Sequence, residues 1–254
     1  MNTNQNPISR RTILRSGGMV AATSAVLAAC GGANKTVTRI GSADTAEKLP
    51  EAHVTDVALL RTAQSVELLV AALLSDPRVT ALADKFTTPL IESFVAAHEG
   101  TAAALTPAIT ARGGQPVETP NEKLMVAFGE PALELIGAGK VADDVLTLAL
   151  ALETLTAATY QYFVQLTNEP ALRAEMVRTG APSSARAAAV AQTINPGTGG
   201  FAPSTNEAGE ANVATLPSAF GSLSSITVAL GAPNEVGTRA TVVMDTPSLN
   251  SIQY

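Results

Sequence analysis

The stretch that decides the fold is residues 145–167, VLTLALALETLTAATYQYFVQLT, in which the only charged residue is Glu153. A helix this apolar must bury nearly all of its surface, either among other helices or in a membrane. A lone central carboxylate is costly in either place unless a partner meets it, and it disfavours a membrane span by about 2.5–3.5 kcal/mol. Five threonines and two glutamines in the same stretch also favour burial among helices.

Three further helical patterns could cover this helix. They are predicted over residues 55–75, 89–111 and 183–194, from apolar residues repeating at helical spacing. Thr55 or Asp56 would cap the first helix, and Ser183 or Ser184 the last. Shorter helices are expected over 121–128, 132–136 and 169–179, with turns at 137–139 and 180–182 and helix ends at 113–114 and 195–197.

The composition changes beyond residue 195. Residues 196–254 are rich in Gly, Pro, Ser and Asn. Two runs with strand character, SITVAL at 225–230 and TRATVVMD at 238–245, flank the loop GAPNEVG and predict a β-hairpin. Disorder is the alternative for this extension, because its aromatic residues are few.

The first thirty residues have the character of an export signal. Arg10 and Arg11 precede a short apolar run at 19–29, which is followed by Cys30. Such a run is too short to span a bilayer. The arginine pair resembles a twin-arginine export signal, and LAAC resembles a bacterial lipobox that lipidates Cys30. We therefore expect an exported protein held on the outer face of the cell membrane by Cys30; the alternative is a plain secretory signal with a chance cysteine.

These features divide the chain into a signal peptide at 1–29, a polar tether at 30–54, a helical domain at 55–195 and the extension at 196–254. The formal net charge is −6, and removal of the signal, which holds three arginines and no acid, would lower it by three. An acidic chain of this kind is not expected to bind nucleic acid, or anionic lipid through a basic patch. Cys30 is the only cysteine, so stability must come from packing rather than from a disulfide.

Three ionisable residues lie on the apolar faces of their own predicted helices. They are Glu67, His98 and Glu153, each with apolar neighbours three, four and seven positions away. One such residue is often a hydrogen-bonded core residue. Three on three helices of one domain predict that the side chains meet.

The helices resemble those of ferritin-like domain proteins, in the branch of exported bacterial members. The resemblance covers residues 55–194 and lies in the order and spacing of four segments: AQSVELLVAAL, FVAAHEGTAAAL, ALALETLTAATYQYF and SSARAAAVAQ. It implies an all-α fold, an antiparallel four-helix bundle, to which the partly β C-terminal extension is added.

The resemblance also implies a position for a metal centre. Metal-binding members use two single glutamates and two Glu-x-x-His pairs. Glu67 and Glu153 match the single glutamates. The second-helix pair becomes His98 and Thr101, and the fourth-helix pair becomes Ser184 and Ala187. Because Ala cannot coordinate and Ser and Thr are poor ligands for these metals, an ordinary dinuclear centre is not expected.

The remaining set, Glu67, His98 and Glu153, leaves two possibilities. It could hold one iron, manganese or zinc ion as a site with three protein ligands. The expectation we favour is a metal-free remnant with no cofactor, in which one carboxyl is protonated or pairs with protonated His98. Such a cluster would fix how the helices pack.

The expected role is therefore binding or structural rather than catalytic. The hairpin is the predicted docking element for a protein partner or a second copy, because exposed strands can add to a sheet. The alternatives are an oxidoreductase or metal-handling protein with a single ion at Glu67, His98 and Glu153, and a carrier of a small apolar ligand. No phosphate-binding loop, nucleophile motif or H-E-x-x-H sequence is present.

Overall fold

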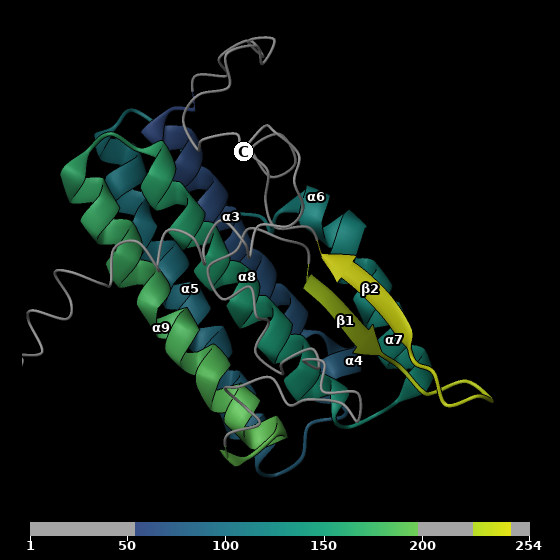
Figure 1. The fold of residues 1–254 in the computed structure, drawn as a ribbon. Helices are drawn as coiled ribbons and strands as arrows, with labels where there is room; N and C mark the ends of the chain where they lie inside the picture. Colours follow the sequence, from purple (N-terminus) through teal and green to yellow (C-terminus); the bar gives the residue numbers. More distant parts are fainter. Residues whose placement is uncertain (1–53, 198–225, 245–254) are drawn as a thin grey trace, which may run out of the picture. The chain divides into compact units, whose positions relative to one another are not determined.

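The computed structural model describes residues 54–197 and 226–244, which form a mostly helical structure with a small antiparallel sheet near the C-terminal end (Figure 1). The predicted signal and all of the predicted tether except Val54, with Arg10, Arg11 and Cys30, lie outside the described residues, as do residues 198–225 and 245–254. The predictions made for those segments stay predictions.

Helix α3, Asp56–Ser75, confirms the first predicted helix. The Thr55 side-chain oxygen caps it by accepting a hydrogen bond from the Ala58 N–H at 3.1 Å. Asp76 ends α3 and caps the short helix α4, Pro77–Thr80. Among the described helices, α3 alone has the length and apolar composition of a membrane span, and 72% of its apolar window is buried, as in a core helix.

Helix α5, Thr87–Ala111, begins two residues before its predicted start. It continues through Gly100 and Pro107, although the proline lacks the N–H for one helical hydrogen bond. The predicted end at Gly113 is confirmed: this residue has φ +75°, a left-handed conformation that glycine adopts without a steric cost.

The connection to the next long helix contains α6, Glu122–Leu124, a π-helical turn η1, Met125–Gly129, and α7, Glu130–Gly139. The turn predicted at residues 137–139 is wrong, because α7 runs to Gly139 and the chain turns at Lys140, with φ 51°. Gly139 serves a close contact instead: a Cβ there would lie 2.4 Å from the Ala232 nitrogen.

Helix α8, Asp144–Leu166, contains the stretch that decides the fold, and most of its residues are buried. Helix α9, Pro170–Ile194, follows it and ends at Asn195 as predicted. The turn predicted at 180–182 and the caps predicted at Ser183 and Ser184 are wrong, because α9 is continuous and starts after Glu169. Gly180 allows a close contact rather than a turn: a Cβ there would lie 2.6 Å from the Tyr160 Cβ.

The four long helices α3, α5, α8 and α9 pack side by side in Figure 1. Helix α8 contacts the other three, and α3 also packs along α5. Leucines of α3 and α8 belong to one hydrophobic core and are fully buried, among them Leu59, Leu69, Leu148 and Leu152. The predicted burial of the helix at 145–167 is thus confirmed.

The predicted hairpin is confirmed as strands β1, Ile226–Leu230, and β2, Ala240–Met244, paired antiparallel with Val228 opposite Val242. Its inner face joins the helical core through Val228, Leu230, Val242 and Met244. A two-stranded sheet is marginally stable alone, so this burial stabilises it.

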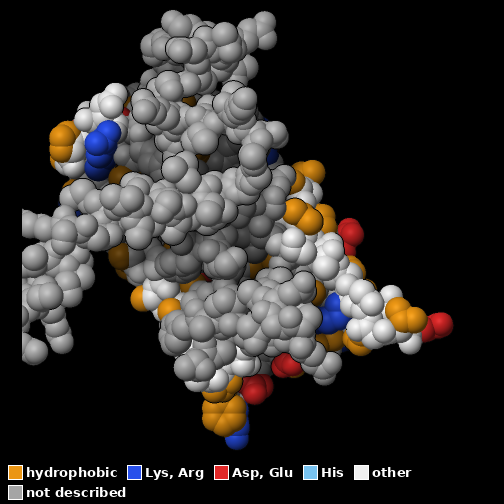
Figure 2. Space-filling view, viewed as in Figure 1, with side chains coloured by type: hydrophobic (Ala, Val, Ile, Leu, Met, Phe, Trp, Pro, Cys, Tyr) orange, Lys and Arg blue, Asp and Glu red, His pale blue; other side chains and the backbone are white. Residues whose placement is uncertain are grey.

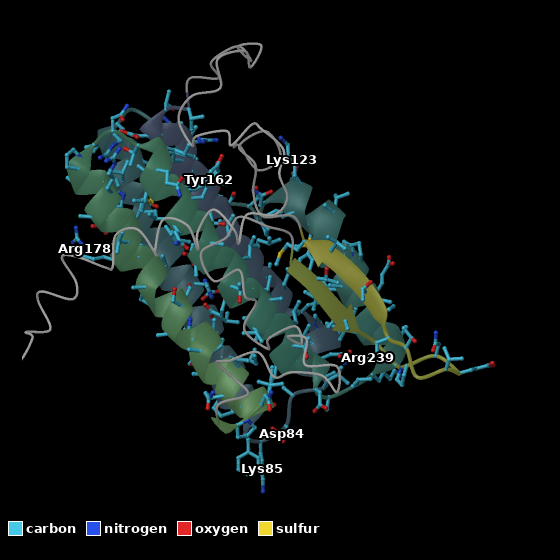
Figure 3. The ribbon with its side chains drawn as sticks, in the orientation of Figure 1. Asp84, Lys85, Lys123, Tyr162, Arg178 and Arg239 are labelled. Atoms are coloured by element: carbon cyan, nitrogen blue, oxygen red, sulfur yellow. The ribbon has the colours of Figure 1, made fainter. Side chains whose placement is uncertain are left out.

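A buried carboxylate fixes the hairpin to the start of α8. Asp144 is fully buried and accepts a hydrogen bond from the Gly231 N–H at 2.8 Å. The Arg239 guanidinium pairs with the same carboxylate and donates to the Gly231 carbonyl oxygen at 2.8 Å. Figure 3 shows Arg239 where the hairpin meets the end of α7.

Candidate functional site

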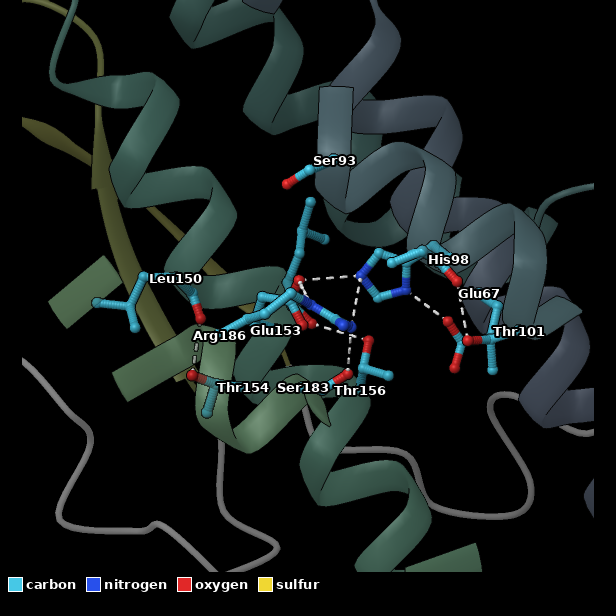
Figure 4. Close-up of polar contacts among 12 residues, drawn as sticks. Glu67, Ser93, His98, Thr101, Leu150, Glu153, Thr154, Thr156, Ser183 and Arg186 are labelled. Carbon is cyan, nitrogen blue, oxygen red and sulfur yellow. Dashed lines mark hydrogen bonds and ion pairs between the residues drawn. The ribbon is translucent and has the colours of Figure 1, made fainter. Parts of the chain in front are cut away.

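The predicted meeting of Glu67, His98 and Glu153 is confirmed. They come from α3, α5 and α8 and are 1%, 0% and 0% exposed, respectively. His98 Nδ1 contacts Glu67 Oε2, and His98 Nε2 lies 3.0 Å from Glu153 Oε1. Figure 4 shows the imidazole ring between the two carboxylates. Helical spacing alone placed each side chain on its inward face.

Two further residues complete the cluster. The Tyr160 hydroxyl donates a hydrogen bond to Glu67 Oε1 at 2.6 Å, from a position two turns along α8 from Glu153. Arg186 reaches in from α9, and its Nε donates to Glu153 Oε1 at 2.6 Å. Its Nη2 also donates to the Ser183 hydroxyl oxygen at 3.0 Å. We call Glu67, His98, Glu153, Tyr160 and Arg186 the buried polar cluster.

Sequence reasoning missed Arg186, although one signal was available. It is the only charged residue at 180–194, in an alanine-rich segment of α9. The fourth-helix positions taken from the resemblance do not contact the cluster as ligands would: Ala187 is fully buried, and Ser184 lines a cavity between α8 and α9. Thr101 donates to the Ala97 carbonyl oxygen of its own helix.

The charges of the cluster compensate one another. Each ring nitrogen of His98 faces a carboxylate oxygen, so both contacts are N–H···O bonds only in the imidazolium form. Burial alone would lower the pKa of His98, but the hydrogen bonds to Glu153 and Glu67 outweigh it and raise the pKa to about 8. The charges of two carboxylates, one imidazolium and one guanidinium sum to zero. Their mutual attraction offsets part of the free-energy cost of removing them from water.

Tyr160 enters the cluster as a neutral donor. Two effects raise the pKa of the Tyr160 hydroxyl well above its usual range. Burial is the larger, and the negative charge of Glu67 is the second. The phenol therefore stays protonated, and its O–H donates a hydrogen bond to Glu67 Oε1.

One acceptor of the cluster is left over. Glu153 Oε2 is buried and has no hydrogen-bond partner among the described residues. An unsatisfied buried acceptor costs about 1–3 kcal/mol, and more when it is charged. The site therefore has capacity for one more donor or cation next to Glu153.

The residues as placed do not fit a metal ion. Within the described parts of the chain, no group of three His, Cys, Asp or Glu side chains is arranged to hold one. Both nitrogens of His98 face carboxylates, which leaves no ring lone pair for a metal. The fixed positive charge of Arg186 lies 2.6 Å from Glu153 Oε1, so it would repel a metal ion bound to this carboxylate. The two carboxylates are instead paired with two side-chain cations, the His98 imidazolium and the Arg186 guanidinium.

A cavity of about 500 Å³ lies beside the cluster, between α8 and α9. Tyr160 belongs to both, because its hydroxyl bonds to Glu67 and its side chain lines the cavity. Small and apolar side chains form most of the lining, with three polar ones: Ala157, Val164, Met176, Val177, Gly180 and Ala181, with Gln161, Gln165 and Ser184.

No protein-family model, curated protein or solved structure matches this chain. The resemblance to ferritin-like domain proteins therefore stays a prediction. The contacts that join α3, α5, α8 and α9 through the buried polar cluster do not depend on it.

Proposed function

We propose that this chain is an exported, lipid-anchored protein of the bacterial cell envelope, built on a ferritin-like four-helix bundle with a binding or structural role rather than a catalytic one. Helices α3, α5, α8 and α9 would be the four helices of the bundle. The observation that supports a role without metal is the bond between Arg186 Nε and Glu153 Oε1 at 2.6 Å, which puts a fixed side-chain cation against a carboxylate that a metal-dependent member would use as a ligand.

The low solvent exposure of the cluster's side chains also favours a role that is not catalytic. Glu153 and His98 are fully buried, and every ionised group has an ionic partner within the cluster. A general acid or base must reach the proton that it transfers. Paired buried charges that no substrate reaches instead select which helices lie together.

Metal content distinguishes this proposal from the alternative, an oxidoreductase or metal-handling protein with one ion at Glu67, His98 and Glu153. The mature protein would be purified from its own envelope without chelators, and its iron, manganese and zinc measured per chain. We expect no stoichiometric metal. Near-stoichiometric metal in the natural protein that is lost in Glu153→Ala would favour the alternative.

The proposed location rests on Arg10, Arg11 and Cys30. Substituting both arginines by lysine would block twin-arginine export and leave the protein in the cytoplasm. Cys30→Ser would leave the exported protein without its lipid, so that it appears in the soluble envelope fraction. If Cys30→Ser remained in the membrane fraction and the natural protein took up no labelled fatty acid, the lipid anchor would be rejected.

The proposed binding role uses the outer side of the hairpin. Its inner side is part of the core, so truncation before the hairpin would also expose buried apolar residues. On the outside, Val243 is 52% exposed in β2 and Val126 is 74% exposed in the neighbouring η1. Figure 2 shows apolar side chains on this part of the described surface. Val243→Glu combined with Val126→Glu tests the role, since it should abolish a dimer or a cross-linked partner without changing the helical circular dichroism.

The cavity between α8 and α9 supports a second candidate function, a carrier of a small, mostly apolar ligand. Its volume of about 500 Å³ and its lining suit such a molecule. A native mass spectrum of the protein from its own envelope would show an added mass. Ala181→Phe, which fills the cavity, should remove that mass; a spectrum of the bare chain alone would reject the carrier.

A further inference from the structure

We infer that Arg186 excludes divalent metal ions from the buried site, and that loss of its positive charge turns His98 and Glu153 into a metal-binding pair. The inference rests on the proposed function, because it explains why the cluster would hold no metal. It assigns a specific role to a residue that sequence patterns did not identify.

The position of Arg186 is fixed by four contacts, one of which places its Nη2 3.4 Å from His98 Nε2. Its Nε donates to Glu153 Oε1 at 2.6 Å, and its Nη2 donates to Ser183 Oγ at 3.0 Å. Its guanidinium carbon lies 5.6 Å from the centre of the Phe94 ring, close enough for a cation–π contact. An incoming ion would have to displace a guanidinium that is bonded, stacked and permanently charged.

Glu153 supplies the ligand capacity. Its Oε2 is buried without a hydrogen-bond partner among the described residues, while Oε1 accepts from both Arg186 and His98. Without the guanidinium, the carboxylate could bind a divalent ion through one or both oxygens. His98 Nε2, which lies 3.0 Å from Oε1, is the neighbouring nitrogen ligand once the incoming ion displaces its proton.

Glu67 has a different place in this site from the one that the sequence suggested. It contacts Nδ1 of His98, on the opposite side of the ring from Glu153. A carboxylate on the second ring nitrogen orients a metal-binding histidine and makes it more basic, without touching the ion. Tyr160 fixes Glu67 in that orientation by its hydrogen bond to Oε1. Glu67 is therefore a positioning residue for His98.

The surroundings provide an entry path. The Arg186 side chain is 19% exposed, whereas the Glu153 side chain is fully buried. Shortening Arg186 would thus open a route from solvent to the Glu153 carboxylate. A nitrogen and two carboxylate oxygens, with water in the remaining positions, suit Zn²⁺, Mn²⁺, Fe²⁺ or Co²⁺.

The test titrates Co²⁺ into the purified natural protein and four variants, and follows the visible absorption of coordinated Co²⁺. Arg186→Gln retains a hydrogen-bond donor and loses the charge; Arg186→Lys retains the charge. The matched control is Arg178→Gln, because Arg178 also lies on α9, is 69% exposed and pairs only with Glu175 among the described acids (Figure 3). Circular dichroism and the midpoint of urea unfolding would show that each variant is folded.

We expect Arg186→Gln to bind Co²⁺ at least about a hundredfold more tightly than the natural protein, since a like charge a few ångströms away is removed. Arg186→Lys and Arg178→Gln should behave as the natural protein. Adding Glu153→Gln to Arg186→Gln should abolish binding. A folded Arg186→Gln that binds no more Co²⁺ than the natural protein would overturn this inference alone. Tight binding by the natural protein would overturn the proposed metal-free function as well.

Discussion

Arg186 Nε donates to Glu153 Oε1 at 2.6 Å, and this bond joins α9 to α8, most of whose residues are buried. It accounts for the lone charge at the centre of α8, which would otherwise be costly to bury. Glu153 also accepts from His98 at 3.0 Å, so α5, α8 and α9 meet at one carboxylate.

Removal of the Glu153 charge should strongly destabilise the fold. Glu153→Gln replaces the carboxylate shared by Arg186 and His98 with a neutral amide, and breaking a buried ion pair costs about 3–5 kcal/mol. Urea unfolding would measure the loss. The control Glu175→Gln removes an exposed partner of Arg178 and should cost less than about 1 kcal/mol. A Glu153→Gln variant as stable as the control would show that the cluster does not stabilise the fold.

The cluster should also make stability depend on pH. The pKa of His98 is raised from 6.5 to about 8 in the folded chain, so the folded state holds this proton more tightly than the unfolded state. The resulting stabilisation, about 2 kcal/mol, is complete below about pH 6.5 and is lost as the pH rises through about 8. Chemical unfolding across this range would measure it. In His98→Gln the decrease should vanish; its persistence would assign it to other groups.

Gly180→Ala and Gly100→Ala, two substitutions inside helices, should change stability in opposite directions. Gly180→Ala puts a Cβ 2.6 Å from the Tyr160 Cβ, and overpacking of this kind costs about 1–3 kcal/mol. Gly100→Ala on α5 meets no described atom within 4 Å and should stabilise the helix by about 0.5–1 kcal/mol. Thermal unfolding would show opposite shifts. Equal shifts would contradict the close contact of α8 and α9 at Gly180.

Loss of Arg239 should loosen the hairpin. Arg239→Ala leaves the fully buried Asp144 with the Gly231 N–H as its remaining donor among the described residues, which should cost about 3 kcal/mol. Hydrogen exchange in β1 and β2 should rise more than in α3. The control Arg112→Ala breaks a half-exposed pair with Glu169 and should cost about 1 kcal/mol or less, without a change in the hairpin. Unchanged exchange in Arg239→Ala would rule out the ion pair as the hairpin's anchor.

Periodicity predicted the positions that face inward, and therefore much of the site. Glu67, His98 and Glu153 each sit among apolar neighbours at helical spacing, and all three are buried in contact. Arg186 could not be found in this way. Its position borders the inward face without belonging to it, and only the length of the side chain takes the charge to Glu153.

Glycine and proline were the weakest signals, because the same residue can end a helix or allow close packing. Gly113 does end α5, with a left-handed backbone. Gly180 and Gly139 lie within helices, where the missing Cβ lets a neighbouring element approach. Sequence gives no sign of which neighbour will be near, so the turns predicted at 137–139 and 180–182 were wrong.

The protonation state of His98 tests the central claim most directly. The chain has two histidines, and His53 can be removed by His53→Gln, so the ring nitrogens of His98 can be followed by NMR after ¹⁵N labelling of histidine. A cluster compensated by imidazolium and guanidinium predicts that both nitrogens carry protons at neutral pH, in protein purified from its own envelope, and that chelator treatment changes nothing. A ring with one unprotonated nitrogen, whose signals shift when metal is removed, would contradict it.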